Sequence, residues 1–433
     1  MVFGLLGLFV VVSRDGCFFG HDPRIDDESS ASRLPTLSHH TQLAVVGGGP
    51  AGLRAAEVAA TAGLQVTLYD AKPSVGRKFL VAGKGGLNLT HGEGFDFFVS
   101  RYSGPDQPVG IWRNLVGDFG ADQLRAWAAE LGVETFQASS GRVYPTALKA
   151  APLLRRWIER LRALGVRFEM GHRMVSLERG TPYRLGFSNG NFVSSDAVIL
   201  ALGGASWAKT GSDGAWTAMM DALGISQHPL KPANCGWECE WTAEILQEAE
   251  GKPLKNLRVR ADELTAIGEL MVTRYGLEGG AIYQLGSVLR SMSEPWVSID
   301  FKPTFSHAQL VAKMESVRRG FLAEARVRWK LSEAACAILG RSEFSDAESL
   351  AREVKDCVIP LARPRPIDEA ISSAGGVCWS ETDFTLMLKK CPGIFVAGEM
   401  IDWEAPTGGY LMQGCFATGT RAANSAVEWL NRS

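Results

Sequence analysis

The residues with the clearest chemical role are three glycines near the start of the globular part of the sequence. Gly47, Gly49 and Gly52 form a Gly-x-Gly-x-x-Gly motif between an apolar run that ends at Val46 and an alanine-rich run that begins at Leu53. In such a motif the first glycine allows a tight turn, the second lets backbone approach a pyrophosphate, and the third lets a helix pack closely on a strand. The helix start then offers free N–H groups and a positive dipole end to a diphosphate. We therefore predict a dinucleotide-binding turn.

An acidic residue follows at the position that commonly contacts a ribose. Residues 42–46 and 65–69 are predicted strands on either side of a predicted helix at 53–62, and Asp70 stands at the end of the second strand. A carboxylate about twenty residues after the glycine motif can accept hydrogen bonds from ribose hydroxyls. Strand, helix and acidic residue together favour nucleotide binding over the alternative, a glycine-rich turn in an ordinary doubly wound sheet.

The remaining pattern predicts an α/β fold that is interrupted by a second domain. Predicted helices cover 121–131, 149–164 and 215–223, predicted strands cover 166–170, 174–177 and 197–202, and the glycine-rich residues 76–92 are expected to form a loop. From 226 to 369 short alternating segments indicate antiparallel strands, followed by a helical run at 307–355. The α/β pattern then returns, with a strand at 393–398 and a helix at 413–430. This order predicts a nucleotide-binding domain at 41–225 and 370–433 with residues 226–369 inserted into it.

Composition excludes several classes of protein. The net charge is −2, which argues against a protein that binds nucleic acid through a basic excess. The eight cysteines contain no Cys-x-x-Cys pair, so neither a thioredoxin-type redox pair nor a metal site is expected. Their scatter is typical of a reducing compartment, and we expect a cytoplasmic protein.

The first forty residues are expected to have no role in the core. The apolar run at residues 2–12 is too short to span a bilayer and lacks the basic flank of a signal peptide. A polar stretch rich in Ser, Asp and Pro follows it. We predict a disordered extension over residues 1–40, no membrane span, and an oligomeric state that the sequence leaves open.

Further blocks of sequence carry a resemblance to a known family. Residues 47–53, 76–80, 83–90, 141–145, 201–204, 273–279, 398–402 and 407–410 occur in the order found in the BaiN/HI0933-like flavoproteins, a family of FAD-dependent (NAD(P)/FAD) oxidoreductases. The chain resembles this family over about residues 41–430. The resemblance implies a glutathione-reductase-like FAD-binding Rossmann domain, interrupted by an inserted domain with a small β-barrel and helices.

The same resemblance implies which residues hold FAD. It assigns the pyrophosphate to the first glycine motif, the adenosine to the end of the second strand and to Val175, and the ribityl chain and isoalloxazine to later blocks. The implied cofactor-binding residues are Gly47, Gly49, Pro50, Ala51, Gly52, Asp70, Ala71, Lys72, Gly76, Arg77, Lys78, Asn88, Thr90, Val175, Gly203, Gly398, Glu399, Asp402, Gly408, Gly409 and Tyr410. The chain departs from its relatives at Gly86-Leu87, where many carry Arg-Cys, so a thiol role at that point is unavailable.

Three residues are candidates for catalysis. Tyr144 could donate a proton or stack on the substrate, although an aromatic packed at the domain interface is the alternative. Asn88 lies in a glycine-rich loop that offers few other polar groups beside the flavin, with Lys84 as a weaker candidate there. Arg274 lies in a family block of the inserted domain, where ordinary loop packing is the alternative.

Two classes of function remain open. The first is an FAD-dependent oxidoreductase that acts on a small organic substrate and reduces a conjugated C=C bond, with NAD(P)H as transient reductant. The second is a flavin-carrying protein whose redox state controls the binding of a partner. A tRNA-modifying flavoprotein is a third option, which the neutral charge balance disfavours. The sequence has no second glycine fingerprint for a nicotinamide nucleotide, so NAD(P)H would have to dock at the flavin itself.

Overall fold

A computed structural model of the protein describes residues 37–83 and 85–432, so most of the predicted extension and Lys84 lie outside the described residues. The first strand, β1 (Leu37–Val46), begins earlier than predicted. His39, His40 and Thr41 pair with residues 193–195 of a neighbouring strand. Residues 37–40 therefore belong to the sheet rather than to the extension. The sequence does not indicate this pairing, because His39 and His40 are polar. The ring of His40 is exposed and bonds Ser194 and Asp196, both at 3.1 Å, on the neighbouring strand.

The main sheet has the parallel order expected of a nucleotide-binding domain. Its strands are β6 (Arg167–Met170), β2 (Val66–Asp70), β1, β9 (Phe192–Leu200), β8 (Tyr183–Phe187) and β7 (Met174–Glu178), in that order, with β18 (Ile394–Val396) also paired to β9. β6, β2, β1, β9 and β18 are parallel neighbours, whereas β7 and β8 pair antiparallel. Val46 and Val396 both pair with Leu200, so the carboxyl ends of β1, β9 and β18 meet at one edge. Ligands of α/β proteins bind at such an edge.

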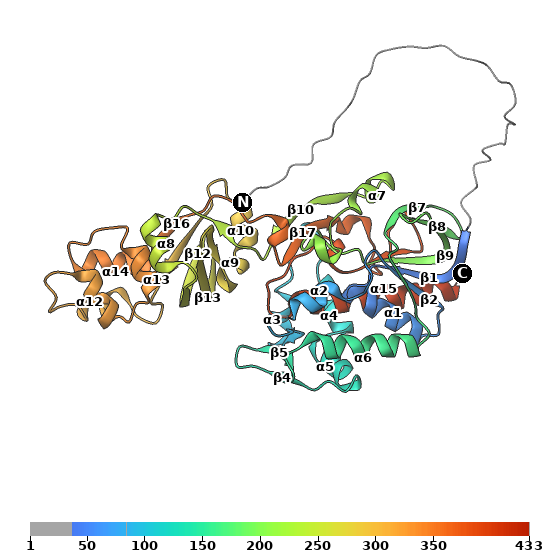
Figure 1. Cartoon of the computed structure of the whole chain (residues 1–433), viewed down its shortest axis with the longest axis horizontal. Helices are drawn as coiled ribbons and strands as arrows, with labels where there is room; N and C mark the ends of the chain where they lie inside the picture. The colour runs from blue at the N-terminus through green and yellow to red at the C-terminus, as the bar shows by residue number, and fades with distance from the viewer. Residues whose placement is uncertain (1–36, 84, 433) are drawn as a thin grey trace, which may run out of the picture. The chain divides into compact units, whose positions relative to one another are not determined.

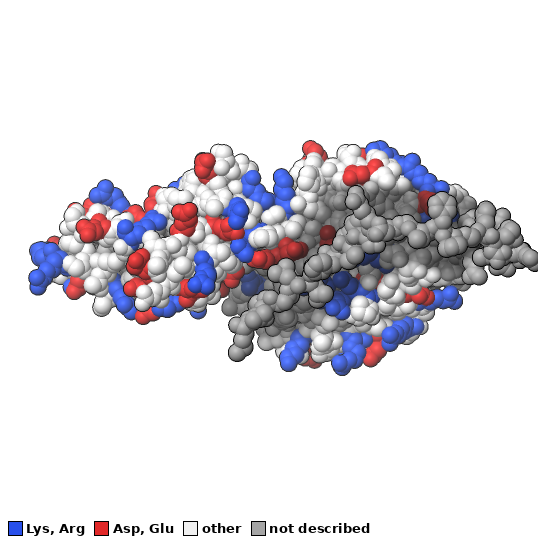
Figure 2. Space-filling view, turned by 45° about the horizontal axis from the view of Figure 1, so that its top comes forward, with Lys and Arg blue, Asp and Glu red and all other residues white. Residues whose placement is uncertain are grey.

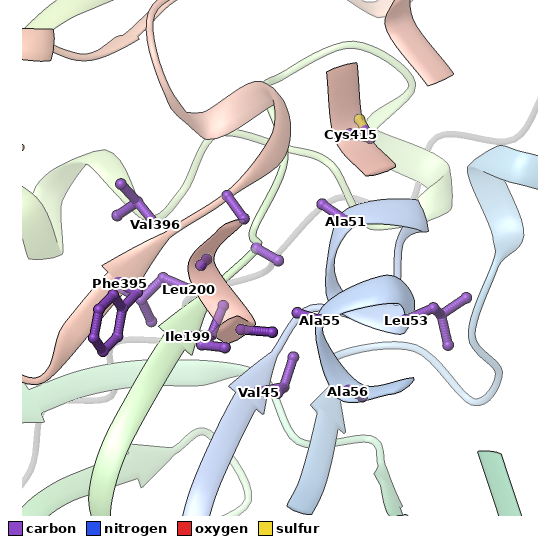
Figure 3. Close-up of a cluster of buried hydrophobic side chains, with 14 of the residues drawn as sticks. Val45, Ala51, Leu53, Ala55, Ala56, Ile199, Leu200, Phe395, Val396 and Cys415 are labelled. Atoms are coloured by element: carbon purple, nitrogen blue, oxygen red, sulfur yellow. The ribbon is translucent and has the colours of Figure 1, made fainter. Parts of the chain in front are cut away.

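Two helices cover this sheet with small side chains. α1 (Pro50–Thr61) carries Ala51, Ala55 and Ala56, which lie beside strand side chains such as Val45 and Leu200 in Figure 3. The long helix α15 (Tyr410–Arg432) packs on α1 (Figure 1). A Cβ on Gly419 would lie 2.4 Å from the carbonyl oxygen of Ala51, so the two helices approach closely only because Gly419 lacks a side chain. Close packing of α1 fixes where its first turn points.

The segment between β2 and β6 is more ordered than the sequence indicated. The helices in it are α2 (Arg77–Ala82), α3 (Phe95–Val99), α4 (Ile111–Asp118), α5 (Ala121–Glu130) and α6 (Ala150–Ala163), and the strands are β3 (Thr90–His91), β4 (Thr135–Gln137) and β5 (Arg142–Pro145). The prediction of a loop over residues 76–92 is wrong, because α2 and β3 lie within it. Gly76 in the left-handed region (φ 69°) starts α2, and Phe79 anchors the helix in the core. One apolar anchor in so short a helix leaves no recognisable period.

A second sheet is formed by residues between β9 and β18. α7 (Thr217–Ala222) leads into β10 (Gln227–Ala233), which pairs antiparallel with β17 (Ser372–Val377). Between them β11 (Trp237–Glu238), β14 (Gly276–Glu278), β13 (Leu264–Thr273), β12 (Pro253–Ala261), β15 (Trp296–Asp300) and β16 (Cys357–Pro360) form an antiparallel sheet in that order. Just beyond β16, the nitrogens of Glu238 and Ala362 donate to the carbonyl oxygens of Arg363 and Glu238 at 2.8 and 2.7 Å. These bonds join the two ends of the strand order into a small barrel.

Helices surround this barrel and share its core. They are α8 (Ala243–Ala249), α9 (Gly280–Gln284), α10 (Gly286–Ser291), α11 (His307–Ala312), α12 (Phe321–Arg328), α13 (Glu333–Leu339) and α14 (Ala347–Lys355). Trp237, Val259, Ile299 and Trp329 lie in a hydrophobic cluster separate from that of the main sheet. We call residues 226–369 the inserted domain, keeping the bounds that the sequence predicted.

Candidate functional site

A cavity opens at the edge where the carboxyl ends of β1, β9 and β18 meet. It encloses about 980 Å³ of space, part of it open to solvent. The predicted cofactor-binding residues that line it are Gly47, Gly49, Pro50, Ala51, Asp70, Ala71, Gly76, Arg77, Lys78, Gly203, Gly398 and Glu399. Segments far apart in the sequence therefore meet at one place, which we call the nucleotide cavity.

The glycine motif has the geometry that a diphosphate requires. Gly47 has a φ of 111°, and a Cβ on it would lie 2.2 Å from the carbonyl oxygen of Ala201. A Cβ on Gly52 would lie 1.8 Å from the carbonyl oxygen of Gly47, so only glycine lets α1 begin this close to β1. At Gly49, in contrast, no described atom lies within 4 Å of such a Cβ, and no side chain caps α1 there. The first N–H groups of α1 therefore face open space in which an anion can bind.

Asp70 holds the end of β2 against the glycine motif. Its Oδ2 accepts from the nitrogen of Gly48 at 2.7 Å, and its Oδ1 accepts from the nitrogen of Lys72 at 2.7 Å. Burial raises the pKa of this carboxyl, while the two backbone hydrogen bonds oppose that shift. Each oxygen keeps a further lone pair, so contact with a ribose hydroxyl is compatible with this arrangement.

An ion pair crosses the nucleotide cavity. Lys78 of α2 lies with Nζ 2.7 Å from Oε2 of Glu399 and 2.7 Å from Oγ of Ser206. Glu399 belongs to the 3-10 helix η4 (Gly398–Met400), which follows β18. Both charged groups are largely screened from solvent, with exposed side-chain fractions of 24% and 11%. Such a pair can exchange hydrogen bonds with the hydroxyls of a polyol chain.

A second group of predicted residues meets at the start of α15. A Cβ on Gly409 would lie 2.5 Å from the backbone carbon of Thr90, so residues 408–410 pack directly on the β3 segment. The Oδ1 of Asn88 and the Oγ1 of Thr90 are buried and have no hydrogen-bond partner among the described residues. Buried polar atoms are nearly always satisfied in folded proteins. Two unsatisfied atoms beside a helix start therefore fit a polar heterocycle, such as the pyrimidine part of a flavin.

The family of the chain follows from comparison with known proteins. A family model described as the HI0933-like protein Rossmann domain matches residues 41–425. The chain belongs to the HI0933-like family. It is therefore an FAD-dependent oxidoreductase.

Two curated relatives match most of this chain and nearly all of their own length. A 3-dehydro-bile acid Δ(4,6)-reductase of Clostridium scindens is 28% identical over 414 residues, which are 89% of this chain and 99% of the relative. A ribosomal RNA dihydrouridine synthase of Escherichia coli is 22% identical over 400 residues, covering 88% and 97%. Among solved structures, a 3-ketosteroid-Δ4-(5α)-dehydrogenase of Rhodococcus jostii has a TM-score of 0.52 at 17% identity, covering 92% of this chain and 99% of that one. At that identity the likeness shows the fold alone.

Four predicted cofactor residues lie outside both the nucleotide cavity and the group at the start of α15. Val175 is 55% exposed, and its neighbours Arg173 and Met174 line the cavity instead. Lys72 does not line the cavity but lies next to Gly211, which does. A Cβ on Gly211 would lie 3.2 Å from Cγ of Lys72. Gly52 acts through helix packing, as described above. Asp402 is buried, and its carboxylate binds Nδ1 of His228 at 2.6 Å and the nitrogen of Gly375 at 3.0 Å.

The catalytic candidates have different surroundings. Asn88 lies in the second group, whereas Tyr144 is half-buried on β5, 3.5 Å from where a Cβ of Gly86 would be, and stacks on Phe136 with ring centroids 5.9 Å apart. Arg274 is exposed in the turn between β13 and β14 and lies outside the residues that line the nucleotide cavity. The structure thus places Tyr144 beside the glycine-rich loop and Arg274 on the inserted domain.

Sequence analysis missed a polar network at the start of α15. The hydroxyl of Tyr410 donates to Oε1 of Glu93 at 2.5 Å, and Arg101 donates to both oxygens of Glu93 at 3.1 and 2.9 Å. Burial pushes the pKa of Glu93 up, but the hydrogen bonds from Arg101 and Tyr410 outweigh it, and the pKa ends below its usual range. Burial, with Glu93 nearby, raises the pKa of Tyr410. The hydroxyl of Tyr410 therefore stays protonated at neutral pH. The only local signal was an acid between two glycines, Gly92 and Gly94.

Metal and membrane alternatives receive no support from the described part of the chain. Within residues 37–83 and 85–432 no group of three or more His, Cys, Asp or Glu side chains is placed to hold a metal ion. No helix in these ranges has the length and apolar character needed to cross a bilayer.

Proposed function

We propose that the chain uses FAD to reduce a C=C bond conjugated to a carbonyl group in a small organic substrate, with NAD(P)H as the reductant. The proposal rests on the match, over almost their whole length, to two relatives whose names describe the same kind of change. A Δ(4,6)-reductase acting on a 3-dehydro-bile acid saturates a C=C bond conjugated to a ketone. Forming dihydrouridine saturates the C5=C6 bond of uracil, which is conjugated to the C4 carbonyl.

Different residues of this chain would bind different parts of FAD. The first turn of α1 and Gly49 would hold the diphosphate, Lys78 and Glu399 the polyol chain, and Asn88 and Thr90 the polar edge of the ring system. When bound and reduced by NAD(P)H, FAD would supply a hydride to the β-carbon of a conjugated carbonyl compound, and a proton added at the α-carbon would complete the reduction. Gly409 packs directly on Thr90, so the start of α15 and the β3 segment would be held in fixed positions beside the ring system.

The inserted domain would provide the substrate side, and the protein would act in the cytoplasm. Figure 2 shows acidic and basic side chains interspersed over the visible face of this domain, in keeping with the net charge of −2. Such a surface favours a small molecule over sequence-independent binding of nucleic acid. The alternative function is a redox-responsive binding protein, in which FAD changes state without efficient turnover.

Anaerobic stopped-flow measurements separate the two functions. The FAD-loaded protein is reduced with NADH or NADPH and mixed with conjugated enones, and flavin absorbance near 450 nm is followed. We expect at least one enone to reoxidise the bound flavin faster than it reoxidises free reduced FAD, which is the matched control. If no enone, quinone or oxygen does so, the reductase proposal fails and the binding-protein alternative stands.

A further inference from the structure

A second cavity lies between the inserted domain and the segment that leads into α15. It encloses about 790 Å³ of space, part of it open to solvent. Thr265 and Ser287 line it from the inserted domain, and Ser100, Arg101 and Pro406 line it from the other side. Its walls therefore come from both domains. We call it the interdomain cavity.

Asn234 lines this cavity and is an unusual residue. It is 4% exposed and has a φ of 51°, in the left-handed region that asparagine adopts more readily than most residues other than glycine. Its Nδ2 donates to Oγ of Ser372 and to the carbonyl oxygen of Ala405, both at 2.8 Å. Because a carbonyl only accepts, the orientation of the amide is fixed, and Oδ1 is the atom left over. That oxygen has no hydrogen-bond partner among the described residues. A buried acceptor without a partner, on a residue that lines a cavity, is consistent with a ligand that donates a hydrogen bond there.

The interdomain cavity is connected to the region that fits the flavin. Pro406 lines the cavity and is followed directly by Thr407 and the Gly408–Tyr410 segment. Arg101 also lines it and holds Glu93 by two hydrogen bonds, and Glu93 accepts from the hydroxyl of Tyr410. A molecule in this cavity would therefore lie next to the start of α15.

The lining is polar. Hydroxyl, amide and charged side chains form most of it, and the apolar contributions come from Leu264, Ala266, Ala405 and Pro406. The carboxylate of Glu404 is held by Arg290 at 2.6 and 2.7 Å, so this wall carries a fixed charge pair. A steroid needs walls that are mainly apolar and aromatic, which this cavity does not offer.

We propose that the interdomain cavity is the substrate pocket, and that Asn234 accepts a hydrogen bond from an N–H or O–H group of a polar conjugated carbonyl compound. This inference rests on the proposed function and chooses between its two substrate chemistries. A ring that carries an N–H beside its carbonyl, as uracil does, matches the unpaired acceptor. A steroid enone has no N–H beside its carbonyl, and androst-4-ene-3,17-dione has neither an N–H nor an O–H group.

A pair of ligands tests the inference without altering the protein. The FAD-loaded protein is titrated calorimetrically with uridine, with 3-methyluridine, which lacks the N–H donor, and with androst-4-ene-3,17-dione. We expect uridine to bind about tenfold more tightly than 3-methyluridine, because one buried hydrogen bond is lost. A short uridine-containing RNA in the same assay shows whether the ring is taken free or within a strand, and binding from either source supports the pocket.

Substitution then assigns the effect to Asn234. In Asn234→Ala the two nucleosides should bind equally, with the flavin spectrum of the parent protein retained. The matched control is Asn256→Ala: Asn256 also has a left-handed backbone (φ 55°), but it is exposed on β12 outside the interdomain cavity. This control should keep the tenfold difference.

Three results would overturn the inference: no binding of uridine in either form, equal binding of both nucleosides to the parent protein, or binding of the steroid alone. These results are distinct from failure of the proposed function. Reoxidation of the flavin by a steroid enone without uridine binding would reject this pocket and keep the reductase. Binding of uridine that depends on Asn234, without reoxidation by any enone, would keep the pocket and reject the reductase.

Discussion

At the scale of single residues, two glycines of the Gly-x-Gly-x-x-Gly motif are needed for different reasons. Gly52 is needed for packing, because a Cβ there would meet the backbone oxygen of Gly47 at 1.8 Å. Gly49 is needed for access, because the space beside it is open and its backbone is extended (φ −79°, ψ −178°), a conformation that alanine adopts freely. Replacement by alanine should therefore lower the stability of the fold at Gly52 and the affinity for FAD at Gly49.

We expect Gly52→Ala to destabilise the apoprotein by about 3 kcal/mol or more, because neither backbone can move without separating α1 from β1. Gly49→Ala should change the stability of the apoprotein by no more than about 1 kcal/mol and yet lower FAD affinity at least tenfold. Urea unfolding of the apoprotein and the ratio of flavin to protein absorbance measure the two effects. Equal urea midpoints for Gly52→Ala and the parent chain would contradict this account.

The glycine motif was predictable because its residues act on near neighbours in the sequence. Residues whose role depends on distant neighbours were not. The roles of Gly47, Gly49 and Gly52 depend on neighbours within a few residues. The unpaired oxygen of Asn234 depends on the carbonyl of Ala405, and the protonation of Tyr410 depends on Glu93. These partners are brought together only by the tertiary fold, so no local pattern indicates them.

At the scale of helices and strands, α1 is held from its far side by a buried charge. Glu57, with 4% of its side chain exposed, accepts from the indole nitrogens of Trp127 and Trp157, each at 2.9 Å to Oε2. It also pairs with Arg54 at 3.2 Å and Arg160 at 3.0 Å. One carboxylate thus links α1 to α5 and α6 and keeps the first turn of α1 aimed at the nucleotide cavity.

Replacing Glu57 with alanine should destabilise the protein by about 3–5 kcal/mol, because two guanidinium and two indole groups lose their buried partner. Chemical denaturation followed by tryptophan fluorescence measures this change. Glu130→Ala is the matched control, since Glu130 also pairs with Arg160 but is 67% exposed. It should cost less than about 1 kcal/mol. Similar losses in the two variants would show that the buried network is not what holds α1.

Periodic segments were predicted well, and short or polar ones were not. The helices predicted at 121–131 and 149–164 are confirmed as α5 and α6, because each repeats its apolar positions over its whole length. α2 was missed because a helix of one or two turns with a single buried anchor, Phe79, has no period to detect.

At the scale of the whole molecule, sequence order was enough to predict an α/β fold with an interruption. β18 is buried and pairs parallel with β9, so residues 394–396 are part of the first sheet. How the barrel closes was not predictable, since it depends on backbone hydrogen bonds between Glu238 and residues 362–363. The contact between the two domains was equally invisible, because Arg290 and Glu404 are separated by 114 residues.

We expect Arg290 to hold the inserted domain in a fixed position against the FAD-binding domain. It lies on α10, with 12% of its side chain exposed, and donates to both oxygens of Glu404 and to the carbonyl oxygen of Pro232 at 3.1 Å. Pro232 belongs to β10, and Glu404 lies just before the segment that leads into α15. The guanidinium of Arg290 therefore links α10 to β10 and to Glu404, which lines the interdomain cavity.

Arg290→Ala should leave flavin content unchanged and raise the KM for a reactive enone about tenfold or more, with a much smaller change in kcat, because the nucleotide cavity is intact while the substrate wall is free to move. Arg290→Lys should give a KM between those of the parent protein and Arg290→Ala, because lysine keeps the charge that pairs with Glu404 but lacks the second nitrogen that binds the carbonyl oxygen of Pro232. Arg363→Ala is the control, because Arg363 also pairs with a carboxylate, that of Glu238, but is 75% exposed. If Arg290→Ala instead lowers kcat and flavin content together with an unchanged KM, this residue supports the cofactor side, and the interdomain wall does not position the substrate.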